Sequence, residues 1–241
     1  MAFQTRPRFA QASVAVQATD EGLRSYMLSV YNYMGLGLVI TGLVAFVVAS
    51  TPALYVPIFT SPLKWVVMLA PLGFVFFLGA RIQAMSASAA QLTFWAFSAV
   101  MGLSLASIFL VYTGESVARV FFITAATFGA VSLYGYTTKR NLAGMGSFLF
   151  MGLIGIVIAG LVNIFLASSA LQFAISVIGV LVFTGLTAWD TQRLKEEYLG
   201  SYAYAGGEMI AKGAIMGALS LYLNFINLFM MLLQLFGNQR N

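Results

Sequence analysis

Long apolar segments separated by short polar stretches run through almost the whole chain. Seven of them approach or exceed the roughly 20 residues that an α-helix needs to cross a bilayer core. They lie at about 26–50, 64–82, 91–112, 117–137, 146–166, 170–191 and 209–236, and a loop at 51–62 joins the first two. The pattern predicts an all-α, polytopic membrane protein. We expect a seven-transmembrane-helix bundle over residues 26–241, preceded by a polar and mobile N-terminal tail at residues 1–25.

The composition supports this interpretation and narrows the possible chemistry. The chain is 61% hydrophobic and 8% charged, whereas soluble domains typically have about 25% charged residues. It contains no cysteine and no histidine, which excludes disulfides, thiol catalysis and histidine-based metal or proton chemistry. It also contains no nucleotide-binding loop or metal-binding motif. We therefore expect no enzymatic activity and no cofactor.

The basic residues predict an orientation rather than a nucleic-acid partner. They lie in short loops between apolar segments, where Lys and Arg mark the cytoplasmic side of a membrane. With seven spans, nine basic residues share a side with the N-terminus: Arg6, Arg8, Arg24, Arg81, Lys139, Arg140, Arg193, Lys195 and Lys212. Three lie on the other side: Lys64, Arg119 and Arg240. This predicts a cytoplasmic N-terminus and an external C-terminus, although a re-entrant last segment would place both ends inside.

Asp190 is the carboxylate that stands out, because it lies at the end of the sixth apolar segment. A charge at the edge of hydrocarbon is costly, so it marks a candidate functional site. The alternative is a residue in the solvated interface that forms a local ion pair with Arg193, three positions later, worth under about 1 kcal/mol. On the residues alone, neither interpretation is favoured.

Small and polar residues follow one face of the last segment. They step by three or four positions, which places them on one side of a helix: Gly213, Gly217, Ser220, Asn224 and Asn227. A related face of the sixth segment carries Thr187 and Asp190. Such faces point into a bundle, because lipid cannot satisfy them. They indicate either ordinary hydrogen bonding between helices or a polar pathway that includes Thr187, Ser220 and Asn227 and ends at Asp190.

Four sequence motifs resemble the Bax inhibitor family, which includes the lifeguard and YccA-like proteins. They are EGLRSYMLSVYNYMGLGL at 21–38, FFITAATFGAVSLYGYTTKRNL at 121–142, FTGLTAWDTQRLK at 183–195 and YLNFINLF at 222–229. The resemblance extends from about residue 20 to the end and is greatest to bacterial members. It implies seven helices around a central last helix, and a location in the bacterial inner (plasma) membrane.

The resemblance also implies a function, namely a pH-sensitive calcium leak. In the family, this leak depends on two aspartates in the last two spans and on an arginine latch from the second span. Asp190 matches the first aspartate, Asn224 replaces the second, and Arg81 aligns with the latch. Two carboxylates in contact resist carrying two charges and so share a proton. Because Asn224 removes this coupling, we expect a single-group pH response and weaker calcium binding by the oxygens of Asp190 and Asn224.

A second function is implied by some bacterial relatives, which resemble regulators of an FtsH-type membrane protease. In this alternative the protein is a non-conducting modulator that binds the protease or another membrane protein. The polar tail at residues 1–25 is the segment that would contact the partner.

Overall fold

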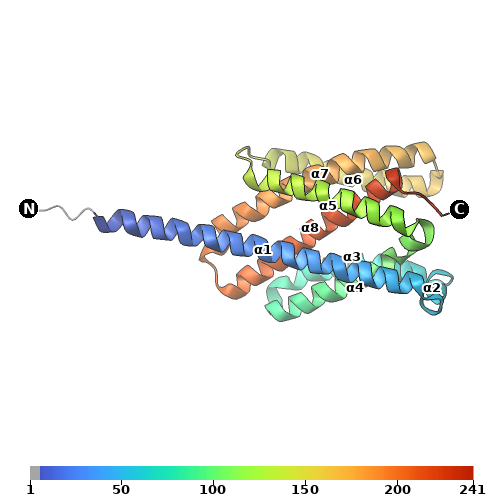
Figure 1. The fold of residues 1–241 in the computed structure, drawn as a ribbon, viewed down its shortest axis with the longest axis horizontal. Coiled ribbons are helices and arrows are strands. Elements are labelled where there is room, and N and C mark those ends of the chain that lie inside the picture. The colour runs from blue at the N-terminus through green and yellow to red at the C-terminus, as the bar shows by residue number, and fades with distance from the viewer. Residues whose placement is uncertain (1–5, 241) are drawn as a thin grey trace, which may run out of the picture.

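The computed structural model describes residues 6–240, and their side chains from Thr19 onward. Within this range the chain folds into eight α-helices and two short 3₁₀ turns, without a β-strand (Figure 1). The α-helices are α1 (Arg6–Ser50), α2 (Pro52–Phe59), α3 (Leu63–Arg81), α4 (Ala87–Val111), α5 (Gly114–Thr137), α6 (Ala143–Leu166), α7 (Ser169–Gly200) and α8 (Gly207–Phe236). The 3₁₀ turns are η1 (Ile82–Ala84) and η2 (Tyr202–Tyr204).

Seven of these helices are long and apolar enough to cross a membrane, all except α2. This confirms the predicted all-α, polytopic fold, with most boundaries within a few residues. Three predictions need correction or limits. The expected loop at 51–62 contains helix α2, which starts with Pro52 at a position where the missing N–H costs nothing. Helix α1 begins at Arg6 rather than near residue 26, and residues 1–5 of the predicted tail lie outside the described residues, so its mobility stays a prediction.

Polar residues at the ends of the apolar segments start the helices. The hydroxyls of Ser86, Thr113 and Ser168 accept hydrogen bonds from backbone N–H groups three residues later, at 3.3 Å in each case. These caps satisfy donors that have no partner inside the helix. The starts of α4, α5 and α7 are thus specified locally by the sequence.

Helix α8 is the centre of the bundle, as the family resemblance implied. In its most apolar window 67% of the residues are buried, against 39% or less in the other spans. It packs against α1, α4, α5 and α7 and crosses them obliquely (Figure 1). A Cβ atom at Gly213 would collide with the ring of Tyr202, and one at Gly217 with the side chain of Leu194. The glycines of the polar face therefore permit the close approach of α7 and its following turn.

The residues after α8 form a C-terminal strap, residues 237–240, that is fastened to the turn between α4 and α5. Gln239 pairs with Tyr112 in an antiparallel bridge. The N–H groups of Thr113 and Arg240 donate to the carbonyls of Asn238 and Val111, at 3.0 and 2.8 Å. The strap therefore fixes the end of α8 to the neighbouring helices.

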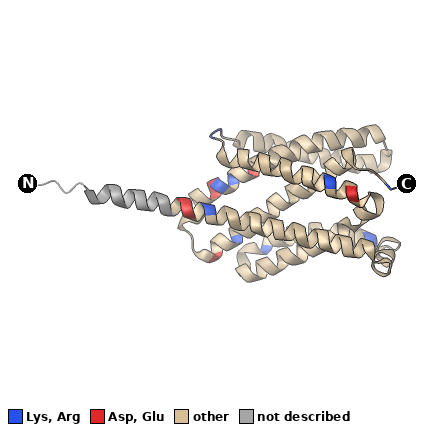
Figure 2. Ribbon diagram, in the orientation of Figure 1, with Lys and Arg blue, Asp and Glu red and all other residues tan. Residues whose placement is uncertain are grey.

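The charged residues gather at the two ends of the bundle and leave its middle apolar (Figure 2). Helix α8 runs as one continuous helix of 30 residues and leads to the C-terminal end of the chain, which lies at the opposite end of the bundle from the start of α1 (Figure 1). The structure therefore does not contain the re-entrant last segment that was the alternative. The two ends of the described chain lie at opposite ends of the bundle.

Candidate ion-binding site between α7 and α8

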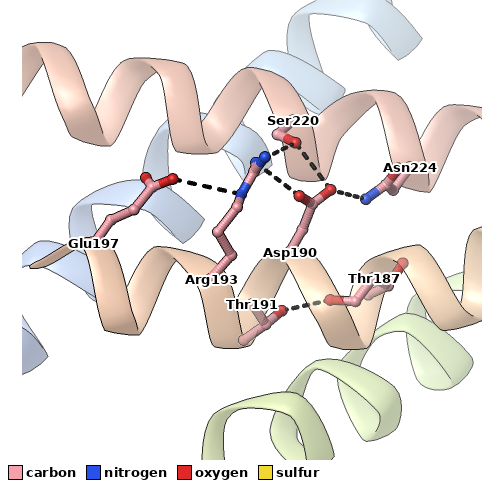
Figure 3. Close-up of polar contacts among 7 residues, drawn as sticks. All are labelled: Thr187, Asp190, Thr191, Arg193, Glu197, Ser220 and Asn224. Atoms are coloured by element: carbon pink, nitrogen blue, oxygen red, sulfur yellow. Dashed lines mark hydrogen bonds and ion pairs between the residues drawn. The ribbon is translucent and has the colours of Figure 1, made fainter. Parts of the chain in front are cut away.

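Asp190 lies at the contact between α7 and α8, with its carboxylate directed at α8 (Figure 3). Its exposed fraction is only 4%, so it does not lie in the solvated interface. A buried carboxylate is stable only when donors replace the water that it has lost. The contacts of Asp190 show where these donors come from.

Two neutral donors come from α8. Ser220 Oγ and Asn224 Nδ2 both donate to Asp190 Oδ2, at 2.9 and 2.6 Å. Ser220 and Asn224 are four residues apart and so lie one above the other on the same helix face. The structure thus brings together three of the residues predicted from sequence. It does so although Asp190 and Asn224 lie at different distances from the turn that joins their helices.

The charged donor comes from α7 itself. Arg193 Nη2 lies 2.7 Å from Asp190 Oδ1 and 3.3 Å from Ser220 Oγ. Its Nε lies 3.6 Å from Glu197 Oε1, and its guanidinium lies 4.8 Å from the centre of the Trp189 ring. Within the described chain, Asp190 Oδ1 has no well-aligned hydrogen bond, so the contact with Arg193 is mainly one of charge. The ion pair is the one considered from sequence, but its carboxylate is buried.

Arg81, the predicted latch, is not at the site. It is the last residue of α3 and is exposed, and none of the ion pairs found among the described residues involves it. In this conformation the countercharge of Asp190 is therefore Arg193. The signal was present in the sequence, because positions 190 and 193 share a helix face, but the family pattern directed attention to Arg81.

The other two residues of the predicted pathway bond within their own helices. Thr187 Oγ1 donates to the Phe183 carbonyl, and Asn227 Nδ2 donates to the Leu223 carbonyl. Figure 3 shows that Thr187 points away from Asp190 and accepts a hydrogen bond from Thr191 through its carbonyl. These contacts are ordinary helix hydrogen bonds, so Thr187 and Asn227 do not extend the site.

A second polar cluster lies further along the same two helices. Gln234 Oε1 accepts hydrogen bonds from Ser176 Oγ at 2.7 Å and from Gln172 Nε2 at 2.6 Å. The sequence analysis did not identify this cluster. Buried apolar residues, including Val182 and Leu228, separate it from Asp190. At the contact between α7 and α8, these polar groups thus form two separate clusters rather than one continuous pathway.

A cleft of about 360 Å³ adjoins the site on the side of Arg193 and Ser220. Arg193 and Ser220 line this cleft together with Glu197 and Tyr202. The oxygen atoms of Asp190, Ser220 and Asn224 are of the kind that calcium prefers, although calcium needs six to eight of them. Within the described residues, no three acidic, histidine or cysteine side chains group together as a metal site.

A seven-helix membrane bundle with a central last helix and a buried carboxylate at the α7–α8 contact defines the class of this protein. The chain belongs to the Bax inhibitor family, since the family described as "Inhibitor of apoptosis-promoting Bax1" matches residues 23–241. It is 48% identical to the inner membrane protein YbhL of Escherichia coli strain K12, over 97% of this chain and 99% of YbhL. It is 49% identical to a protein of Rickettsia prowazekii (92% of this chain, 93% of the relative) and 46% identical to one of Caulobacter vibrioides (97% and 96%).

The contact between Asn224 and Asp190 predicts the effect of restoring an acid at position 224. Asn224→Asp would replace the 2.6 Å donor contact with two carboxylates that cannot both ionise easily. We expect the free energy of unfolding to fall by about 1–3 kcal/mol relative to wild type, because the donor is lost. This deficit in stability should grow as pH rises, because both carboxylates then tend to ionise. Thermal unfolding in detergent at pH 5 and pH 8 measures both effects.

The matched control is the exchanged pair, Asp190→Asn combined with Asn224→Asp. It again has one carboxylate and one amide, so its deficit relative to wild type should not grow between pH 5 and pH 8. Equal unfolding temperatures for wild type and Asn224→Asp at both pH values would show that the two positions do not interact.

Proposed function

We propose that this protein is a pH-sensitive calcium or cation leak that is gated around Asp190. The observation that carries the proposal is a carboxylate with 4% exposure that is held by one guanidinium next to an open cleft. Intramembrane acids of this kind typically mark ion pathways. Calcium is the transported ion in this proposal, not a resident cofactor, and we propose no enzymatic activity.

The conformation described here corresponds to a closed state in this proposal. Arg193 occupies the carboxylate that a cation would need, and apolar residues fill the bundle between the Asp190 site and the Gln234 cluster. Opening therefore requires Arg193 to leave Asp190 and the α7–α8 contact to loosen. Glu197, at 3.6 Å from Arg193 Nε, offers the guanidinium a second carboxylate on the cleft side.

Protonation of Asp190 gives the leak its pH sensitivity. A neutral carboxyl no longer attracts Arg193, and Ser220 and Asn224 from α8 add no charge of their own. The charged groups near Asp190 are thus Arg193 and, through it, Glu197. Because Asn224 cannot share a proton, the response should follow one titrating group rather than a coupled pair.

The leak predicts a specific flux pattern in liposomes. Calcium flux through the wild type should be about tenfold higher at pH 5 than at pH 8, the effect of about 1.4 kcal/mol on the barrier, because protonation of Asp190 releases Arg193. Asp190→Asn, which is neutral at both pH values, should remove this pH dependence. Arg193→Gln should raise flux at pH 8, because it removes the competing cation. Flux is measured with a calcium-sensitive dye inside the liposomes.

Lys212→Gln is the matched control for Arg193→Gln. Lys212 is also a cation near the same end of the bundle, but it pairs with Glu208, at 3.5 Å, and not with Asp190. Its flux should equal that of wild type. Equal fluxes for wild type, Asp190→Asn and Arg193→Gln at both pH values would refute the leak.

We further propose that the protein lies in the bacterial inner membrane with its N-terminus, and hence the Asp190 end, in the cytoplasm. The support is the name of its relative YbhL and the excess of Lys and Arg at that end. The chain has no cysteine, so single cysteines report orientation cleanly. With an impermeant maleimide on spheroplasts, Thr60→Cys should be labelled and Lys139→Cys should not, and the reverse result would invert the topology.

A second candidate function is the non-conducting modulator of a membrane protease of the FtsH type. One observation favours it: Asn224 stands in place of a second acid, and Arg193 neutralises the remaining Asp190. A site with no net charge is a poor cation site, whereas a binding partner needs no ion pathway.

A pull-down from bacterial membranes distinguishes this candidate. The full chain should retain the protease and a variant without residues 1–25 should lose it, because the tail is the proposed contact. Retention by both forms would refute the role of the tail. Retention together with unchanged flux in Asp190→Asn would favour the modulator over the leak.

A further inference from the structure

A groove runs along the outside of the bundle between α1 and α5, which lie apart along most of their length and are joined across the groove by a hydrogen bond of 2.6 Å between Tyr31 and Ser132. It consists of two cavities of about 500 and 480 Å³ that lie end to end. On α1 the lining of one cavity ends at Met34 and that of the other begins at Gly35. On α5 one lining ends at Phe122 and the other begins at Phe128, less than two helical turns further along. Figure 1 shows α8 crossing behind the two helices. We call this feature the α1–α5 groove.

Aromatic rings form the floor of the groove, and glycines in its two walls leave open space. Phe225 of α8 packs edge-to-face against Phe121 and Phe128 of α5, with ring centres 5.5 Å apart in both pairs. Gly35 and Gly129, on opposite walls, have open space where a side chain would extend. The groove is therefore largely apolar, and its open space suits a chain-like hydrocarbon group.

One end of the groove is basic. Arg24 lines it and, within the described part of the chain, forms no ion pair. Tyr136 lines the opposite wall, and Lys195 lies against it, with Nζ 3.0 Å from the Tyr136 carbonyl and 5.1 Å from its ring centre. Two cations thus flank the mouth of an apolar groove, which is the arrangement that an anionic amphiphile matches.

We propose that the α1–α5 groove binds an anionic phospholipid, with its phosphate between Arg24 and Lys195 and one acyl chain between α1 and α5. The dimensions agree with one leaflet. From Arg24 to Met34 the helix rises about 15 Å, which is half of the roughly 30 Å hydrocarbon core. A lipid from the leaflet at the Asp190 end therefore reaches the junction of the two cavities with its chain. This proposal does not depend on ion conduction.

The charge of the lipid follows from the number of cations. Each basic side chain near a membrane surface contributes about 1 kcal/mol to the binding of anionic lipid. A zwitterionic lipid would gain from the apolar groove alone, so a preference for anionic lipid identifies the headgroup contact separately from the acyl-chain contact.

Native mass spectrometry of the full chain tests the proposal, with phosphatidylglycerol and phosphatidylcholine of identical acyl chains as competing probes. Wild type should retain phosphatidylglycerol preferentially. Arg24→Gln should lower its retention about fivefold and leave that of phosphatidylcholine unchanged. Gly129→Leu should lower the retention of both lipids, since it fills the groove.

Two variants are matched controls. Gly155→Leu adds the same side chain at an exposed position of α6 that also has open space around it, and Lys64→Gln removes a cation at the opposite end of the bundle. Both should retain lipid as wild type does, and circular dichroism should show that all four variants are folded. Equal retention of the two lipids by wild type, or the same retention in Gly129→Leu as in Gly155→Leu, would overturn the proposal.

Discussion

A carboxylate that is buried between two membrane helices imposes one constraint on the whole bundle, because its lost hydration must be replaced by donors at fixed positions. Asp190 meets this requirement with two neutral donors from α8 and one guanidinium from its own helix. The register of α7 against α8 is thereby specified, since a shift of one turn would leave the charge without Ser220 and Asn224. Gly217 permits the close approach that these bonds need. The central helix is thus held in place by a polar contact in an otherwise apolar bundle.

Hydropathy predicted the seven spans well, because a bilayer demands length and apolarity from every crossing helix. It did not predict α2, which is too short to cross and begins with a proline that resembled a loop boundary. Nor could spacing predict the contact of Asp190 with Asn224. Counted from the connecting turn the two residues lie at different depths, and only the oblique crossing of α8 (Figure 1) brings them together. That crossing depends on packing across the whole bundle.

The choice of countercharge shows a different limit of sequence reasoning. Arg193 was visible as a neighbour on the same helix face, and its energy was judged as that of a solvated pair. Burial of Asp190 to 4% exposure changes this judgement, because the guanidinium now replaces water rather than competing with it. A family motif, by contrast, pointed to Arg81, which is exposed at the end of α3. The sequence does not directly give the burial of Asp190 or the exposure of Arg81, and these two properties identify Arg193 as the countercharge.

The C-terminal strap has a consequence for how the central helix can move. Its hydrogen bonds to Thr113 and Val111 hold the Phe236 end of α8, whereas the Gly207 end follows a short 3₁₀ turn. A tilt of α8 therefore pivots at Phe236, and displacement grows along the helix in proportion to the rise from that point. Gly207, roughly 44 Å away, moves about 2.4 times as far as Asn224, roughly 18 Å away. A small change at the Asp190 contact is thus accompanied by a much larger swing of the helix end that carries Glu208 and Lys212.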